Sequence, residues 1–124
     1  MVDRWLLLGA RLLIAQLFLL GALQKWLSPG DVEGLLAGRG WPTWLIWPAM
    51  ALNLTAGLAL VAGWRVREVA VLLAVYCGVT SIFHLIPADP WQMTIFVKNW
   101  AIAGGCLALG ATASPGPWRP RSRR

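Results

Sequence analysis

The chain has 124 residues, of which 58% are hydrophobic and only 13% are charged. Soluble domains carry roughly a quarter charged residues, so the composition excludes an ordinary soluble domain, and the length allows one domain over residues 1–124. The net charge of +6 does not indicate nucleic-acid binding. The basic tail directly follows an apolar segment, whereas nucleic-acid binders carry Lys and Arg on a polar, soluble face.

Four long apolar stretches can each cross a membrane as a helix. They lie at about residues 5–24, 44–63, 66–85 and 94–111. About 20 helical residues span a hydrocarbon core of about 30 Å, and each stretch ends near a proline or glycine that breaks helices. The sequence therefore predicts an all-α fold, a transmembrane antiparallel four-helix bundle. Between the first two stretches, residues 32–36 are expected to form a short interfacial helix.

The first stretch begins where a signal peptide would lie, but its form differs. It is longer than a typical apolar signal region, Arg11 and Gln16 interrupt it, and no clear cleavage site follows. We therefore interpret it as a membrane helix. Arg11 lies about 10 Å from its start. Its guanidinium is expected either to return to the headgroups or to pair within the bundle with Glu68 or Asn53.

Small residues mark two faces on which helices can approach each other closely. Lipid gives apolar helices no hydrophobic reason to associate, so close packing and hydrogen bonds must hold a bundle together. The second stretch has Ala49, Asn53 and Gly57 at four-residue spacing. The fourth stretch has a similar face, made of Ala101, Gly104, Gly105 and Ala108.

The third stretch carries a polar stripe and a cysteine. Tyr76, Thr80 and His84 follow one another at four-residue spacing and so share a helix face. His84 is the single histidine of the chain, and no Cys or carboxylate lies at ligand spacing, so no metal site is predicted. Cys77 and Cys106 should differ by roughly 9 Å in membrane depth, which argues against a disulfide.

Polar side chains gather where three of the predicted helices end on one side of the membrane. Gln24 and Lys25 close the first helix, His84 closes the third, and Lys98 with Asn99 opens the fourth. Interfacial anchoring is the plain interpretation. The sharper hypothesis is a quinone headgroup pocket, because the two carbonyl oxygens of a quinone need hydrogen-bond donors. The remaining intramembrane polar groups are assigned structural roles: Arg11, Asn53, Tyr76 and Thr80.

Lysine and arginine are unevenly divided between the two sides that the four spans define. With the N-terminus inside, eight lie on that side or just within the membrane, against three on the other. The eight are Arg4, Arg11, Arg65, Arg67, Arg119, Arg121, Arg123 and Arg124, and the three are Lys25, Arg39 and Lys98. Cytoplasmic loops carry such an excess. We therefore predict a protein of the plasma (inner) membrane with both termini and the basic tail 112–124 in the cytoplasm.

The nine tryptophans are expected at or near the helix ends, with none in mid-membrane. The indole ring is apolar while its N–H needs a partner, so tryptophan favours the membrane interface. This distribution supports the positions of the four spans.

Several segments resemble the DoxX family of small bacterial and archaeal membrane proteins. The sequence FVKNWAIAGG at 96–105 is similar to the family's F-x-K-N-x-A-x-x-G-G motif. Phe83-His84 resembles the family's ending of the third helix, and the resemblance covers about residues 4–111. The family's opening pattern of Arg, Phe, Gly and Lys is matched by Arg11, Phe18, Gly21 and Lys25. The sequence departs from the family at Asn53, where many members carry an acid that would serve as a counter-ion.

The resemblance implies a membrane subunit that supports a redox complex. Relatives include a subunit associated with a thiosulfate:quinone oxidoreductase and members linked to oxidative-stress or thiol-redox complexes. The chain has no flavin, haem or iron–sulfur motif of its own, so quinone is the one cofactor considered. Partners are expected to be the lipid bilayer and either a redox protein or a second copy. The alternatives are an assembly subunit without chemistry and a small-molecule or lipid carrier.

Overall fold

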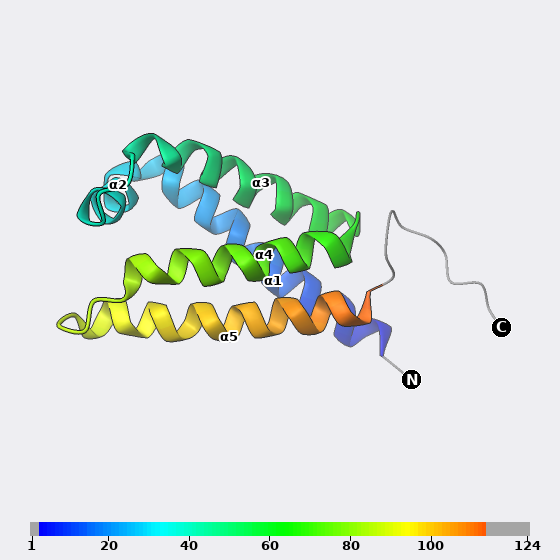
Figure 1. Cartoon of the computed structure of the whole chain (residues 1–124). Helices are drawn as coiled ribbons and strands as arrows, with labels where there is room; N and C mark the ends of the chain where they lie inside the picture. The colour runs from blue at the N-terminus through cyan, green and yellow to red at the C-terminus, as the bar shows by residue number, and fades with distance from the viewer. Residues whose placement is uncertain (1–2, 114–124) are drawn as a thin grey trace.

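A computed structural model describes residues 3–113 and shows an all-helical molecule in which four long helices lie along one axis (Figure 1). The basic residues of the tail lie outside these residues. The helices have the following bounds: α1 Arg4–Leu27, α2 Pro29–Gly38, α3 Ile46–Ala62, α4 Val66–Ser81 and α5 Pro90–Thr112. Two 3-10 turns, η1 Thr43–Leu45 and η2 Ile82–His84, extend α3 and α4.

Four segments are long and apolar enough to cross a membrane, as the sequence predicts. They are Arg4–Leu27, Thr43–Ala62, Val66–His84 and Pro90–Thr112. The short helix expected at 32–36 is longer in the structure, because Pro29 occupies its first turn and favours helix initiation there. This α2 lies across one end of the bundle, which we call the α2 end (Figure 1). The opposite end holds the turn between α3 and α4 and is called the hairpin end.

Helix α5 begins four residues earlier than expected, and this moves two side chains inward. The Asp89 carboxylate accepts hydrogen bonds from the backbone N–H groups of Trp91 (3.0 Å) and Gln92 (3.3 Å), which caps the helix at Pro90. Lys98 is therefore about 12 Å into the helix rather than at its start. Trp100 lies in the middle of α5, so the expectation that no tryptophan is in mid-membrane was wrong.

The bundle is built from two closely packed helix pairs, α1 with α3 and α4 with α5. The α3–α4 and α1–α5 contacts that close the ring are smaller. Small and medium side chains fill the centre. The buried core consists of Ala15, Phe18, Ala56, Leu60, Ala70, Leu73, Ala74, Cys77, Ala103, Cys106 and Leu109. Both cysteines are free thiols in this core.

The small face of α3 packs against α1, as predicted. Gly57 is buried, and a Cβ at this position would lie only 2.7 Å from Cγ of Leu19 and 3.4 Å from the carbonyl oxygen of Ala15. Glycine therefore permits the close approach of the two helices. The small face of α5 differs: its residues Ala101, Gly104, Gly105 and Ala108 are exposed, and Ala103, Cys106 and Gly110 are buried instead.

Arg11 reaches the hairpin end and does not lie beside Asn53. A Cβ placed on Gly63 would lie 3.2 Å from Nη1 of Arg11, which locates the guanidinium against this turn. Gly63 has a φ of 78°, a left-handed conformation that closes α3 and that glycine adopts without steric cost. Of the two fates predicted for Arg11, pairing with Asn53 was wrong.

Candidate functional site

A buried amide joins three helices near the α2 end of the bundle. Asn53 of α3 is only 3% exposed and is one of the few buried polar residues in the part of the chain that the structure describes. Its amide is assigned with the oxygen toward Lys25, because this orientation gives both ends of the amide a suitable partner. The oxygen then accepts from Nζ of Lys25 at 3.0 Å, and Nδ2 donates to the Tyr76 hydroxyl and the Ala49 carbonyl, both at 3.2 Å.

The Lys25 side chain points into the membrane rather than out of it. Lys25 lies in the last turn of α1, from which a lysine usually extends to the aqueous interface. Helical side chains lean toward the N-terminus of their helix, and for α1 this direction leads into the bundle. Nζ lies 3.5 Å from the carbonyl oxygen of Gly21, one turn back, and half of the side chain is covered. The ammonium is thus held by neutral oxygens inside an apolar bundle.

Gly21 provides the room for this arrangement. A Cβ at this position would lie 3.1 Å from the end of the Asn53 amide that faces Lys25, and 3.8 Å from Nζ of Lys25. Any side chain at residue 21 would therefore crowd the amide that holds the ammonium. The motif Gly21 and Lys25, one turn apart on α1, has a direct physical reason in this contact.

Tyr76 completes the cluster from the opposite side of the bundle. Its ring packs edge-to-face on Phe18 of α1 with a centroid distance of 6.3 Å, so aromatic side chains of α1 and α4 meet across the centre. Because the hydroxyl oxygen accepts from Asn53, the hydroxyl proton can be donated to another acceptor. Lys25 and Tyr76 thus offer two donors on either side of one fixed amide. We call Lys25, Asn53 and Tyr76 the polar triad.

His84 belongs to a second polar pair at the same end. Its Nδ1 lies 2.6 Å from Oε1 of Gln92 in the first turn of α5, which indicates an Nδ1–H donor and leaves Nε2 as the acceptor. This hydrogen bond ties η2 to α5 across the connecting turn. Within the described residues, no group of three or more His, Cys, Asp or Glu side chains is arranged to hold a metal ion.

The other residues of the predicted quinone pocket are separated from Lys25 by their exposure. Gln24 and Lys98 are exposed side chains, and Asn99 is half-buried on α5. Thr80 donates back to the Tyr76 carbonyl at 2.8 Å, within its own helix. The structure therefore brings Lys25 together with residues assigned structural roles rather than with the other pocket residues.

Sequence patterns contain a signal for the triad that depth counting missed. Asn53 lies on the small face of α3, and Lys25 shares a face of α1 with Phe18, seven residues earlier. The packing of these two faces brings the amide to the ammonium. The position of Lys25 at a helix end instead indicated an outward side chain, since the bend of its stem cannot be deduced from spacing.

Comparisons with known proteins agree with this architecture. A family model described as DoxX matches residues 6–85, well over half of the chain. The chain belongs to the DoxX family. The matched region contains the whole polar triad, whereas the FVKNWAIAGG segment of α5 lies beyond it. This DoxX protein is also 29% identical over 112 residues to the "Inner membrane protein YqjF" of Escherichia coli (strain K12), across 90% of this chain and 85% of that protein.

No solved structure matches the chain. Family membership, the inner-membrane relative and the four apolar helices together make this DoxX protein a multi-pass membrane protein. Lipid is therefore the solvent for its outer surface, and the polar triad lies inside a membrane-spanning bundle.

Proposed function

We propose that this DoxX protein is a membrane subunit that supports a redox complex by holding a quinone headgroup at the polar triad. The observation that carries the proposal is the inward-pointing Lys25 ammonium, fixed by Asn53 within hydrogen-bonding reach of the same amide as Tyr76. Ionisable groups inside a membrane protein are costly, and they commonly mark functional sites. We infer a subunit rather than a self-sufficient enzyme.

The donor set fits a quinone headgroup. A quinone supplies two-electron, two-proton redox chemistry when it is bound, and its carbonyl oxygens accept hydrogen bonds. The Lys25 ammonium has three N–H groups, of which the Asn53 and Gly21 oxygens occupy two. The remaining N–H and the Tyr76 hydroxyl are both available to an acceptor. Asn53 orients these two donors, and the Phe18 ring offers an apolar surface beside them.

Quinone retention tests this proposal. The protein is extracted in mild detergent with added ubiquinone, and the bound quinone is quantified after organic extraction. Lys25→Met and Tyr76→Phe each remove one donor and are expected to weaken binding by roughly tenfold, since about 1.4 kcal/mol corresponds to a factor of ten. Lys98→Met is the matched control, because it makes the same substitution at an exposed lysine on α5.

His84→Ala separates two locations for the headgroup. If this variant alone loses quinone, the ligand lies at the His84–Gln92 pair and the triad proposal is wrong. Equal quinone in all five proteins, wild type included, would show only lipid-like partitioning and would also contradict the proposal.

An assembly role is the second candidate, and one observation favours it. The face formed by Ala101, Gly104, Gly105 and Ala108 is exposed on α5, and a Cβ at Gly104 would meet nothing within 4 Å. Small faces allow close helix contact in membranes, so this face suits a helix of a redox partner or of a second copy. A stoichiometric protein that co-purifies without quinone would favour this role.

We infer that the protein lies in the inner membrane with both termini in the cytoplasm. Its relative is an inner membrane protein by name, and the hairpin end carries Arg4, Arg65 and Arg67, which cytoplasmic loops favour. Cysteine labelling tests this orientation with little background, since Cys77 and Cys106 are buried.

In intact spheroplasts, Ala88→Cys at the α2 end is expected to react with a membrane-impermeant maleimide. Trp64→Cys at the hairpin end is expected to react only after the cells are permeabilised, because it faces the cytoplasm in the proposed orientation. The reverse pattern would place both termini outside.

A further inference from the structure

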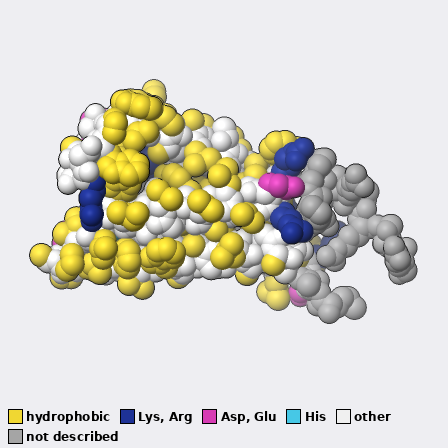
Figure 2. Space-filling model, in the orientation of Figure 1, with side chains coloured by type: hydrophobic (Ala, Val, Ile, Leu, Met, Phe, Trp, Pro, Cys, Tyr) yellow, Lys and Arg dark blue, Asp and Glu magenta, His cyan; other side chains and the backbone are white. Residues whose placement is uncertain are grey.

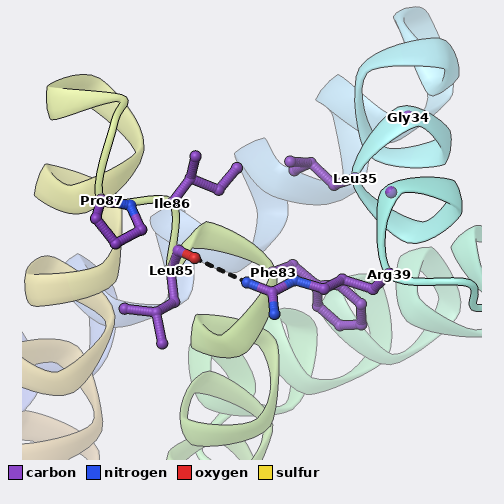
Figure 3. A pocket seen from close by; sticks show the side chains of 8 residues that line it. Gly34, Leu35, Arg39, Phe83, Leu85, Ile86 and Pro87 are labelled. Atoms are coloured by element: carbon purple, nitrogen blue, oxygen red, sulfur yellow. Dashed lines mark hydrogen bonds between the residues drawn. The ribbon is translucent and has the colours of Figure 1, made fainter.

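An open cleft of about 370 Å³ lies at the α2 end, between α2 and the segment that follows η2 (Figure 3). Its walls come from residues about 45 positions apart in the chain, and neither wall includes a member of the polar triad. One charged side chain, Arg39, lines it, and the remaining side chains of the lining are apolar. The cleft therefore combines a cation with an apolar surface.

Arg39 is held at one wall of the cleft. Its Nη2 donates to the carbonyl oxygen of Leu85 at 2.8 Å, as the dashed line in Figure 3 marks. Guanidinium has five N–H donors, so this bond fixes the group and leaves other donors for a ligand. Arg39 is exposed, and no carboxylate is among the residues that line the cleft. The planar donor arrangement of arginine suits phosphate.

The wall that α2 contributes is open because it is built from glycines. Gly34 and Gly38 lie one turn apart, and a Cβ at either position would meet no atom within 4 Å. The opposite wall is apolar and includes Phe83, which is 9% exposed, and Ile86. A ligand can therefore lie along α2 with its charged group on Arg39 and apolar atoms against these side chains.

The cleft lies at the depth of the membrane interface. It is beside the ends of the α1 and α3 spans, where Trp26 and Trp44 are 65% and 61% exposed. Trp41 packs on Phe83 with a centroid distance of 5.1 Å and so frames the cleft directly. Tryptophan concentrates at the level of the lipid headgroups. Lipid phosphates occur at this level at high local concentration.

We propose that this cleft binds one anionic phospholipid, with its phosphate on Arg39 and its glycerol and upper acyl region against the apolar wall. The charge of Arg39 complements the phosphate, and an anionic headgroup adds no ammonium that would compete for that phosphate. The bound lipid connects α2 to the segment after η2, two parts that Arg39 already joins. This site is separate from the polar triad and does not depend on the quinone proposal.

Native mass spectrometry of protein from mixed detergent–lipid micelles tests the proposal. With phosphatidylglycerol as the probe, the wild type is expected to retain one lipid. Arg39→Gln removes the charge but keeps an N–H donor for the Leu85 carbonyl, and Gly34→Leu fills the cleft. Each variant is expected to reduce retention at least tenfold. Gly30→Leu is the matched control, because it lies on the same helix, has open space around it and does not line the cleft.

Three results would overturn the lipid assignment. Equal retention by wild type, Arg39→Gln and Gly34→Leu would mean that the lipid binds elsewhere. Equal retention of phosphatidylethanolamine would contradict the preference for an anionic headgroup. Displacement of the lipid by millimolar inorganic phosphate would assign the site to free phosphate. Helical circular dichroism like that of the wild type confirms that the variants fold.

Discussion

Replacing Asn53 by leucine is expected to destabilise the bundle by about 2 kcal/mol, because a hydrogen bond to a charged group contributes about 1.5–3 kcal/mol. The substitution leaves the Lys25 ammonium with the distant Gly21 carbonyl at 3.5 Å as its remaining partner, and it removes the bond to the Tyr76 hydroxyl. Leucine and asparagine have similar lengths, so packing against α1 changes little. The measurement is the loss of helical circular dichroism during titration with sodium dodecyl sulfate in mixed micelles.

Two further variants separate the loss of a partner from the loss of packing. Asn53→Asp keeps an oxygen for Lys25 and for the Tyr76 hydroxyl, so it is expected to retain most of the stability. The double variant Lys25→Met/Asn53→Leu removes the buried cation as well and is expected to be more stable than Asn53→Leu alone. If the double variant is destabilised by the sum of the two single effects, Lys25 and Asn53 do not interact.

The difference between these residues and the spans shows what the sequence can predict. The four spans follow from length and apolar composition, which depend on the bilayer and not on how the helices pack. The start of α5 was placed too late because residues 90–93 are not strongly apolar, and the Asp89 cap outweighs their composition. The depth of Lys98 changed with this boundary.

The candidate site depends on side-chain direction, which spacing does not determine. Lys25 was expected at an interfacial pocket and instead turns toward Asn53, because α1 and α3 pack through their small faces. The small face of α5 follows the same pattern as that of α3, yet it is exposed. Small-residue spacing therefore identifies faces that allow close contact, but the topology decides whether the partner helix belongs to the same chain.

Replacing Gly57 by alanine tests the closest of these helix contacts. The added Cβ would lie 2.7 Å from Cγ of Leu19 and 3.4 Å from the backbone oxygen of Ala15, so α1 and α3 must move apart. Overpacking costs about 1–3 kcal/mol, whereas alanine gains about 1 kcal/mol over glycine in a helix interior. We expect a net destabilisation of about 1 kcal/mol in the same detergent titration, with a weaker Lys25–Asn53 contact as a consequence.

Gly104→Ala is the matched control for this substitution. Gly104 lies in the interior of α5, and a Cβ there would meet nothing within 4 Å, so only the helix-propensity gain remains in the isolated protein. The two alanine variants are therefore expected to shift stability in opposite directions. If Gly57→Ala stabilises the protein as much as Gly104→Ala does, α1 and α3 are not in close contact, and the Lys25 ammonium cannot be held by Asn53 at the distance described.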